Sequence, residues 1–250
     1  MKTKQFYPYS LTNSSLYSFF KRPLIFTLLA TILMTVSCKK DIDPAVTVPA
    51  TVDYNDFTYH TIKIGEQVWM VENLRTTKYN DGITPIPLAT ISQQWSDPTG
   101  AYAPYLPEPE DNTKTYGLLY SWYAVSKNLA PKGWHIPTRE DWNQLRTNLG
   151  GKEKAGKAMK EKDFEHWDDF SNGAFNGSNS SKFTALPGGI RGNSFILIRK
   201  NAYFWSATTY SDTEAYGNIL SSSTDSFDES SAINKKSGLS VRCIMDEPAK

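Results

Sequence analysis

An apolar run near the N-terminus most constrains how this 250-residue chain folds, because it separates a leader from the rest. The run covers residues 24–36, follows Lys21 and Arg22, and ends just before Cys38. It is 13 residues long, whereas a helix that crosses a bilayer needs about 20 apolar residues. We therefore expect residues 1–38 to be a signal peptide, and the residues that follow to make the fold.

The residues around Cys38 resemble the lipobox of bacterial lipoproteins, in which small residues precede a cysteine that is lipidated and becomes the first residue after cleavage. Here Thr35, Val36 and Ser37 precede Cys38, and Thr35 stands where the motif usually has Leu. We expect Cys38 to carry the lipid; the alternative is an ordinary secretory signal with an incidental cysteine. One acyl chain binds a membrane only marginally and two hold firmly, so lipidation would decide attachment.

The charge balance does not favour a nucleic-acid partner. The whole chain has 27 Lys and Arg against 26 Asp and Glu, and removing residues 1–38 changes the net charge from +1 to −3. No basic footprint for DNA or RNA is expected from this composition. Residues 39–43, a lysine pair followed by acidic residues, resemble the export tag on surface lipoproteins of Bacteroidetes-type bacteria. We expect an outer-membrane lipoprotein that faces the cell surface or the periplasm.

The rest of the chain divides into a tether and one domain. Residues 39–53 contain prolines and few large apolar side chains, which predicts a flexible tether before a domain at 54–246. Strand-like residues on both sides of Gly65 predict a hairpin. Residues 83–115 hold six prolines and scattered aromatic residues, which predicts a long ordered loop.

Helical signals come early in the domain and strand signals late. Thr138 is a candidate N-cap for a helix at 138–149, and a second short helix is expected at 152–161. Residues 116–125 are assigned a short helix as well. Strands are expected at 183–186, 194–199, 202–208, 215–220 and 239–245. Without βαβ alternation, this order favours an α+β fold with a largely antiparallel sheet and long ordered loops.

Seven ordered sequence blocks within residues 54–246 resemble the Fibrobacter succinogenes major paralogous domain. The blocks are GEQVWMVENL at 65–74, KYNDG at 78–82, YGLLYSWYAV at 116–125, GWHIPT at 133–138, FTALPGGIR at 183–191, FWSAT at 204–208 and SVRC at 240–243. The resemblance implies a module of secreted proteins and lipoproteins. It also implies a compact fold similar to the C-type lectin-like and formylglycine-generating-enzyme group, and leaves activity and ligand open.

One position departs from the family pattern. Members usually carry a cysteine directly before the Pro that opens the Gly-Trp-His block, whereas here that residue is Ala130. The resemblance therefore implies that Cys243 lacks its disulfide partner, and we expect a buried thiol there. A single thiol in the domain also disfavours the oxidase chemistry of the formylglycine-generating enzymes, which uses a pair of cysteines.

No catalytic residue, metal or cofactor is expected. His60, His135 and His166 are spaced far apart, unlike the ligands of an HExxH zinc helix, and His135 is expected to be a buried, hydrogen-bonded ring. The sequence has no GxSxG, Gly-rich phosphate loop or EF-hand spacing. The Glu-Pro-Asn, Gln-Pro-Asp and Trp-Asn-Asp motifs of calcium-dependent lectins are also missing.

His166 keeps an enzymatic alternative open, because acidic residues flank it in the sequence. Retaining glycoside hydrolases place two carboxyl groups about 5 Å apart, and inverting ones place them about 6.5–9.5 Å apart. Glu165, Asp168 or Asp169 would serve as such a pair only if folding brings them to a cleft.

Aromatic residues are the remaining candidates for function, since a flat ring suits stacking on sugars and anchoring at interfaces. Trp95, Tyr102, Tyr105 and Tyr210 lie in polar, turn-rich surroundings, and we expect them to be exposed and to bind ligand. The alternative is that the loops bury these rings to stabilise themselves. The tryptophans in apolar blocks are expected in the core: Trp69, Trp122, Trp134, Trp142 and Trp205.

The sequence thus predicts a lipid-anchored, non-enzymatic cell-surface module that binds a glycan or a cell-surface protein through loop aromatics. One alternative is a structural or assembly component of the cell envelope. The other is a glycoside hydrolase-like enzyme that uses paired carboxylates near His166.

Overall fold

The structure, a computed structural model, describes residues 48–247 except residues 108 and 171. These residues belong to one compact unit. The predicted signal peptide and Cys38 lie outside the described residues, so lipidation stays a prediction. Among the described helices, none is both long enough and apolar enough to cross a membrane.

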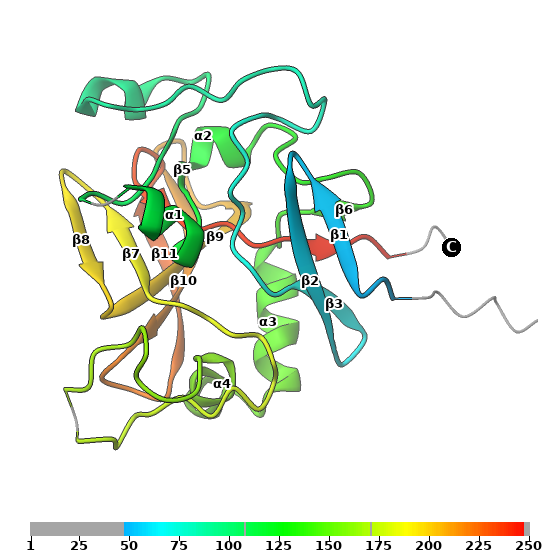
Figure 1. The fold of residues 1–250 in the computed structure, drawn as a ribbon, viewed down its shortest axis with the longest axis vertical. Helices are drawn as coiled ribbons and strands as arrows, with labels where there is room; N and C mark the ends of the chain where they lie inside the picture. The colour runs from blue at the N-terminus through cyan, green and yellow to red at the C-terminus, as the bar shows by residue number, and fades with distance from the viewer. Residues whose placement is uncertain (1–47, 108, 171, 248–250) are drawn as a thin grey trace, which may run out of the picture. The chain divides into compact units, whose positions relative to one another are not determined.

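The first sheet joins the start of the described chain to its end (Figure 1). All its strand pairs are antiparallel. The predicted hairpin at Gly65 is confirmed; this residue has a φ of 62°, and a Cβ there would lie 2.3 Å from Asn148. The first strand occupies the last three residues of the predicted tether. The strand order is β1 (Thr51–Tyr54), β2 (Phe57–Ile64), β3 (Gln67–Met70), β13 (Ile244–Met245) and β6 (Trp134–His135).

The second sheet holds most of the late strands. Its pairs are antiparallel except β7 with β9, which confirms the α+β class and the largely antiparallel sheet. The order is β11 (Phe227–Asn234), β10 (Glu214–Ser221), β9 (Asn201–Thr209), β7 (Gly188–Arg191), β12 (Gly238–Leu239), β5 (Leu119–Ser121) and β4 (Tyr102–Ala103), with β8 (Phe195–Ile198) paired to β7.

Short helices connect the strands, and the two that the sequence predicts most clearly are both present. In α3 (Arg139–Asn148), Thr138 is the N-cap, and it exchanges hydrogen bonds with Asp141 in a capping box. The second is α4 (Lys152–Met159). The described chain also has α1 (Pro109–Tyr116), α2 (Trp122–Val125) and the 3-10 helix η1 (Ser92–Ser96).

Three predictions about local structure are wrong. The strand expected at 239–245 is instead two short strands in different sheets, β12 and β13, separated by residues 240–243. Residues 116–125 divide between β5 and α2, because the first half pairs with strands on both sides and Tyr120 donates a hydrogen bond to the Thr76 carbonyl at 2.7 Å. Residues 183–186 form no strand beyond a single bridge from Ala185 to Lys160. The predicted loop at 83–115 contains η1, β4 and most of α1, which the sequence analysis missed.

An aromatic cluster joins the two sheets in the core. Trp142, fully buried on α3, has its ring centroid 4.8 Å from that of Trp69 in the first sheet. The same ring lies 5.6 Å from Phe204 and 5.7 Å from Phe227, both in the second sheet. Of the five tryptophans expected in the core, Trp122 alone is half-buried and the others are buried: Trp69, Trp134, Trp142 and Trp205.

A buried lysine closes the loop after α4. The Lys160 ammonium is 1% exposed and donates hydrogen bonds to the carbonyls of Phe175 and Thr224, both at 2.7 Å, and to that of Ser221 at 3.2 Å. It lies 3.7 Å from an Asp225 carboxylate oxygen. Burial lowers the pKa of Lys160 to about 8, so the side chain is still charged at pH 7. The Lys160 ammonium therefore joins the chain after α4 to two other segments, the loop at Phe175 and the turn at residues 221–225.

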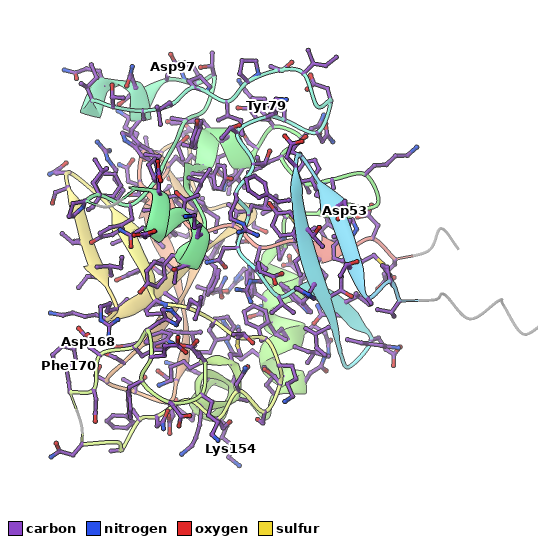
Figure 2. The ribbon with its side chains drawn as sticks, in the orientation of Figure 1. Asp53, Tyr79, Asp97, Lys154, Asp168 and Phe170 are labelled. Carbon is purple, nitrogen blue, oxygen red and sulfur yellow. The ribbon has the colours of Figure 1, made fainter. Side chains whose placement is uncertain are left out.

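Replacing this lysine should destabilise the fold. Lys160→Met keeps the length and apolar stem but leaves three carbonyls without this donor and leaves Asp225 only Lys157, 3.8 Å away, as a cation. We expect the free energy of unfolding to fall by about 3 kcal/mol in denaturant titrations. Lys154→Met, on the exposed side of α4 (Figure 2), should change it by less than about 0.5 kcal/mol. Equal effects of the two substitutions would contradict this role.

Candidate functional site

Two of the four aromatic candidates are buried, so the expectation that they are exposed is wrong. Trp95 is 2% exposed and Tyr105 is 6% exposed. The Arg191 guanidinium lies 4.6 Å from the Trp95 ring, and Tyr105 packs edge-on against Phe195 at 5.2 Å. Both rings belong to a separate small core that stabilises the long loop against the second sheet. The alternative stated for these rings, burial beneath their own loops, describes them correctly.

The other two candidates reach solvent in different settings. Tyr210, just after β9, is 52% exposed and packs edge-on against Tyr216 at 5.5 Å. Tyr102, in β4, is half-buried and lines a cleft. Whether either residue binds a ligand stays a prediction.

The cleft has a volume of about 420 Å³ and lies where the two sheets and α1 come together. The chain that follows β3 runs between β2 and α1 (Figure 1) and supplies one wall. Apolar side chains make most of the lining: Phe57, Leu88, Tyr102, Pro104 and Leu118. Charged side chains stand among them: Arg75, Glu110 and Lys114. A cavity of this size with an apolar lining and a few polar groups is typical of small-ligand sites.

Arg75 is held over two rings in this cleft. Its guanidinium carbon lies 4.9 Å from the Phe57 ring centroid and 5.9 Å from that of Tyr59. Its backbone N–H donates to the Tyr59 hydroxyl at 3.0 Å, and burial raises the pKa of that hydroxyl to about 12. The Arg75 Nε is buried and has no hydrogen-bond partner among the described residues. An unpaired buried donor costs about 1–3 kcal/mol.

A second, smaller cleft of about 120 Å³ borders the same two cations. Arg75 and Lys114 line both clefts, and the buried guanidinium of Arg242 lines the smaller one. Glu72 also lines it, but its carboxylate already accepts from the backbone N–H of His60 at 2.8 Å and contacts the His60 ring Nδ1 at 2.7 Å. The sequence analysis missed Arg75 and Lys114, because a lone Arg after an apolar block and a Lys in a polar helix carry no distinctive spacing.

Asp168 and Asp169, two of the three acids named for the hydrolase alternative, do not join a carboxylate pair at His166. Asp168 pairs with Arg199 at 2.9 Å (Asp168 is labelled in Figure 2), and Asp169 accepts a hydrogen bond from a nearby loop N–H. Glu165 and His166 instead lie close to Glu161, which the sequence analysis did not single out. Ligand atoms of these three residues lie within 4.8 Å of one another. Both Glu161 carboxylate oxygens lie 2.9 Å from the His166 Nδ1, so Glu161 and His166 are paired with each other.

A sequence model of the Fibrobacter succinogenes major domain matches residues 62–245. The chain belongs to this family. No curated protein and no solved structure matches the chain. Membership of the Fibrobacter succinogenes major domain family assigns no activity, and the expected likeness to C-type lectin-like folds stays a prediction.

The single cysteine of the described residues in this Fibrobacter succinogenes major domain is a buried thiol. Cys243 is free and fully buried, as expected, and burial raises the pKa of its thiol. Ala130, at the position where other members carry a cysteine, is buried in the same apolar cluster.

His135 is hydrogen-bonded as expected, but its side chain is 38% exposed rather than buried. The ring Nδ1 lies 2.7 Å from an Asp246 carboxylate oxygen, and Nε2 lies 3.2 Å from Asp141. The hydrogen bond to Asp141 raises the pKa of His135, with a further contribution from Asp246. The pKa of Asp141 is lowered, because hydrogen bonds from His135 and Thr138 outweigh its burial. The ring thus bridges the start of α3 and Asp246, and both contacts favour its protonated form.

This bridge should make stability depend on pH. Because the folded-state pKa of His135 is raised, its contribution is complete below about pH 6.5 and is lost as pH rises through the folded-state value. Asp141 sets the lower limit, since its contribution is lost in acid. We expect the free energy of unfolding to fall as pH rises from about 6.5 through the folded-state pKa of His135, and His135→Gln to reduce that fall in denaturant titrations. Parallel pH profiles for the two proteins would contradict this.

Proposed function

We propose that this protein is a lipid-anchored, non-enzymatic module of the cell envelope that binds a glycan or a protein in the cleft at Tyr102. The single observation that supports this is the 420 Å³ cleft, which combines a largely apolar lining with three charged side chains. The proposal narrows the sequence-based expectation, because Trp95 and Tyr105 are buried and no longer count as contacts. Tyr102 remains a candidate ligand contact, and Phe57 and Leu88, which line the same cleft, are added as candidates.

The anchor is supported by the sequence alone. The apolar run at 24–36 precedes Cys38 and is too short to span a bilayer, and the body after it carries a net charge of −3. Such a body gains little from anionic lipids, so acyl chains on Cys38 are proposed to hold the protein at the outer membrane.

The absence of catalysis is supported by how the candidate acids are engaged. Asp168 is paired with Arg199, and Glu161 with His166, so that neither carboxylate faces the cleft at Tyr102. The cleft itself is lined by one carboxylate, Glu110, and by no histidine. General acid–base chemistry on a sugar needs two positioned acids, whereas recognition needs none.

Binding should depend on the cleft residues. The full chain, purified in detergent, is applied to arrays of glycans and cell-wall polysaccharides. We expect Tyr102→Ala to weaken binding at least about tenfold, since a well-packed aromatic contact at an interface is worth 1 kcal/mol or more. Leu88→Asp, at an exposed cleft position, should weaken binding without affecting the fold. Tyr210→Ala, which removes an exposed ring outside the cleft lining, is the matched control.

The same experiment separates the rival functions. Binding that Tyr210→Ala abolishes and Tyr102→Ala leaves unchanged would move the site away from the cleft. Turnover of a polysaccharide that Glu161→Gln abolishes would favour the hydrolase. No binding and no turnover would contradict the proposal and favour a structural role in the envelope.

Lipidation is tested separately on cells. Cys38→Ser should move the protein from the membrane fraction to the soluble fraction and abolish incorporation of a labelled fatty acid, because no second apolar anchor is expected in the mature chain. The matched control is Cys243→Ser, whose thiol is buried inside the domain. Membrane association that persists in Cys38→Ser would rule out the lipid anchor.

A further inference from the structure

We propose that the cleft at Tyr102 recognises a carboxylated sugar, a uronic acid within a polysaccharide, and that Arg75 binds its carboxylate. This inference rests on the proposed function, because it names the ligand class of the same cleft. Three features of the described residues support it: an arginine with an unpaired hydrogen-bond donor, a group of cations between two clefts, and an apolar lining beside them.

Arg75 differs from four other arginines of the described chain. Arg139 pairs with Glu229 and Arg199 with Asp168, while Arg146 and Arg242 donate to amide and carbonyl oxygens. For Arg75, the side chain interacts with the Tyr59 hydroxyl, but the described residues supply neither an ion pair nor a partner for its buried Nε. Its guanidinium is held against Phe57, so its planar fork is already oriented. A carboxylate fits such a fork with two parallel hydrogen bonds.

The charges around Arg75 favour an anion. Arg75 and Lys114 border both clefts, and Arg242 borders the smaller one. Of the two carboxylates in these linings, Glu72 is engaged by His60, which leaves Glu110 on the exposed rim. The only ion pair that the structure gives Lys114 is an exposed contact with Asp111 at 3.9 Å. The mature chain has a net charge of −3, so this concentration of cations is local.

The apolar lining favours a sugar ring over a peptide C-terminus as the ligand. Phe57 and Tyr102 offer aromatic surface, and Pro104 and Leu118 extend the apolar lining. A sugar ring has apolar C–H faces that stack on aromatic rings, and a uronic acid adds a carboxylate at the ring edge. Peptide C-termini are commonly captured by nests of backbone N–H groups, whereas the cations that line this cleft are the side chains of Arg75 and Lys114. A uronic acid uses both halves of the site at once.

The test compares each acid with its own ester. Tetramers of galacturonic, mannuronic and glucuronic acid, and their methyl esters, are titrated into the full chain in detergent by calorimetry. Esterification removes the charge and keeps the ring. We expect at least one acid to bind about tenfold more tightly than its ester, and more weakly as salt is raised.

Variants assign the effect to Arg75. Arg75→Gln should remove the preference for acid over ester, and Arg75→Lys, which keeps the charge but not the fork, should retain only part of it. Lys114→Gln removes a second positive charge at a side chain that is 73% exposed and therefore not packed. We expect it to lower the affinity for the acid about twofold to fivefold. Lys154→Gln is the matched control. Melting temperatures verify that Arg75→Gln remains folded; if it does not, Lys114→Gln and the ester series decide the question.

The outcomes separate this inference from the function on which it rests. Binding of neutral glycans that Tyr102→Ala abolishes and Arg75→Gln leaves unchanged would overturn the acid-sugar inference and keep the binding module. Preference for a sulfated sugar, or for a peptide with a free C-terminal carboxylate, would overturn it in favour of that ligand. Failure to bind any tetramer, acid or ester, would also overturn the acid-sugar inference. If no glycan on the full array is bound, both the acid-sugar inference and the binding module are overturned.

Discussion

The buried guanidinium of Arg242 is the interaction on which the arrangement of the domain depends. Its Nε and Nη2 donate to the Asn73 side-chain oxygen at 3.2 and 2.8 Å, and Nη1 donates to the Phe183 carbonyl. The guanidinium carbon lies 4.2 Å from the Phe183 ring and 5.4 Å from that of Phe204. Burial lowers its pKa to about 9, which leaves the charge in place at pH 7. Amide dipoles, ring faces and the charge of the Glu72 carboxylate stabilise this cation.

That network also fixes the wall of the cleft. The Asn73 side chain donates to the Tyr116 carbonyl at 2.8 Å, while the Leu74 N–H donates to the Val241 carbonyl at 2.8 Å and the Leu74 carbonyl accepts from Leu118. The segment after β3 is therefore tied on both sides immediately before Arg75. A side chain that projects from a segment held this firmly has little freedom left to lose when it binds, which favours recognition by a preformed site.

The sequence predicts those parts of the fold that depend on local contacts. The hairpin at Gly65 and the capping box at Thr138 use residues next to one another in the chain, and both are present. The strand β11 was missed because its residues are mostly polar and half-buried, without clean alternation. Trp95 was misplaced for a different reason: its burial depends on Gly238, where a Cβ would lie 2.7 Å from the ring, and on Arg191, both remote in sequence. No local pattern records such contacts.

The candidate site also depends on residues that are remote in sequence, so no local pattern predicts it. A comparison of two arginines explains why Arg75 is a candidate for binding and Arg242 is not. Arg242 and Arg75 both lie over a phenylalanine ring, so stacking alone does not distinguish them. Every donor nitrogen of Arg242 has an oxygen partner, which accounts for its complete burial. Arg75 has the ring but lacks a partner for its buried Nε among the described residues, and it borders open space on two sides. A buried donor that the fold leaves unpaired beside a cleft is explained most simply by an acceptor that arrives from outside the chain.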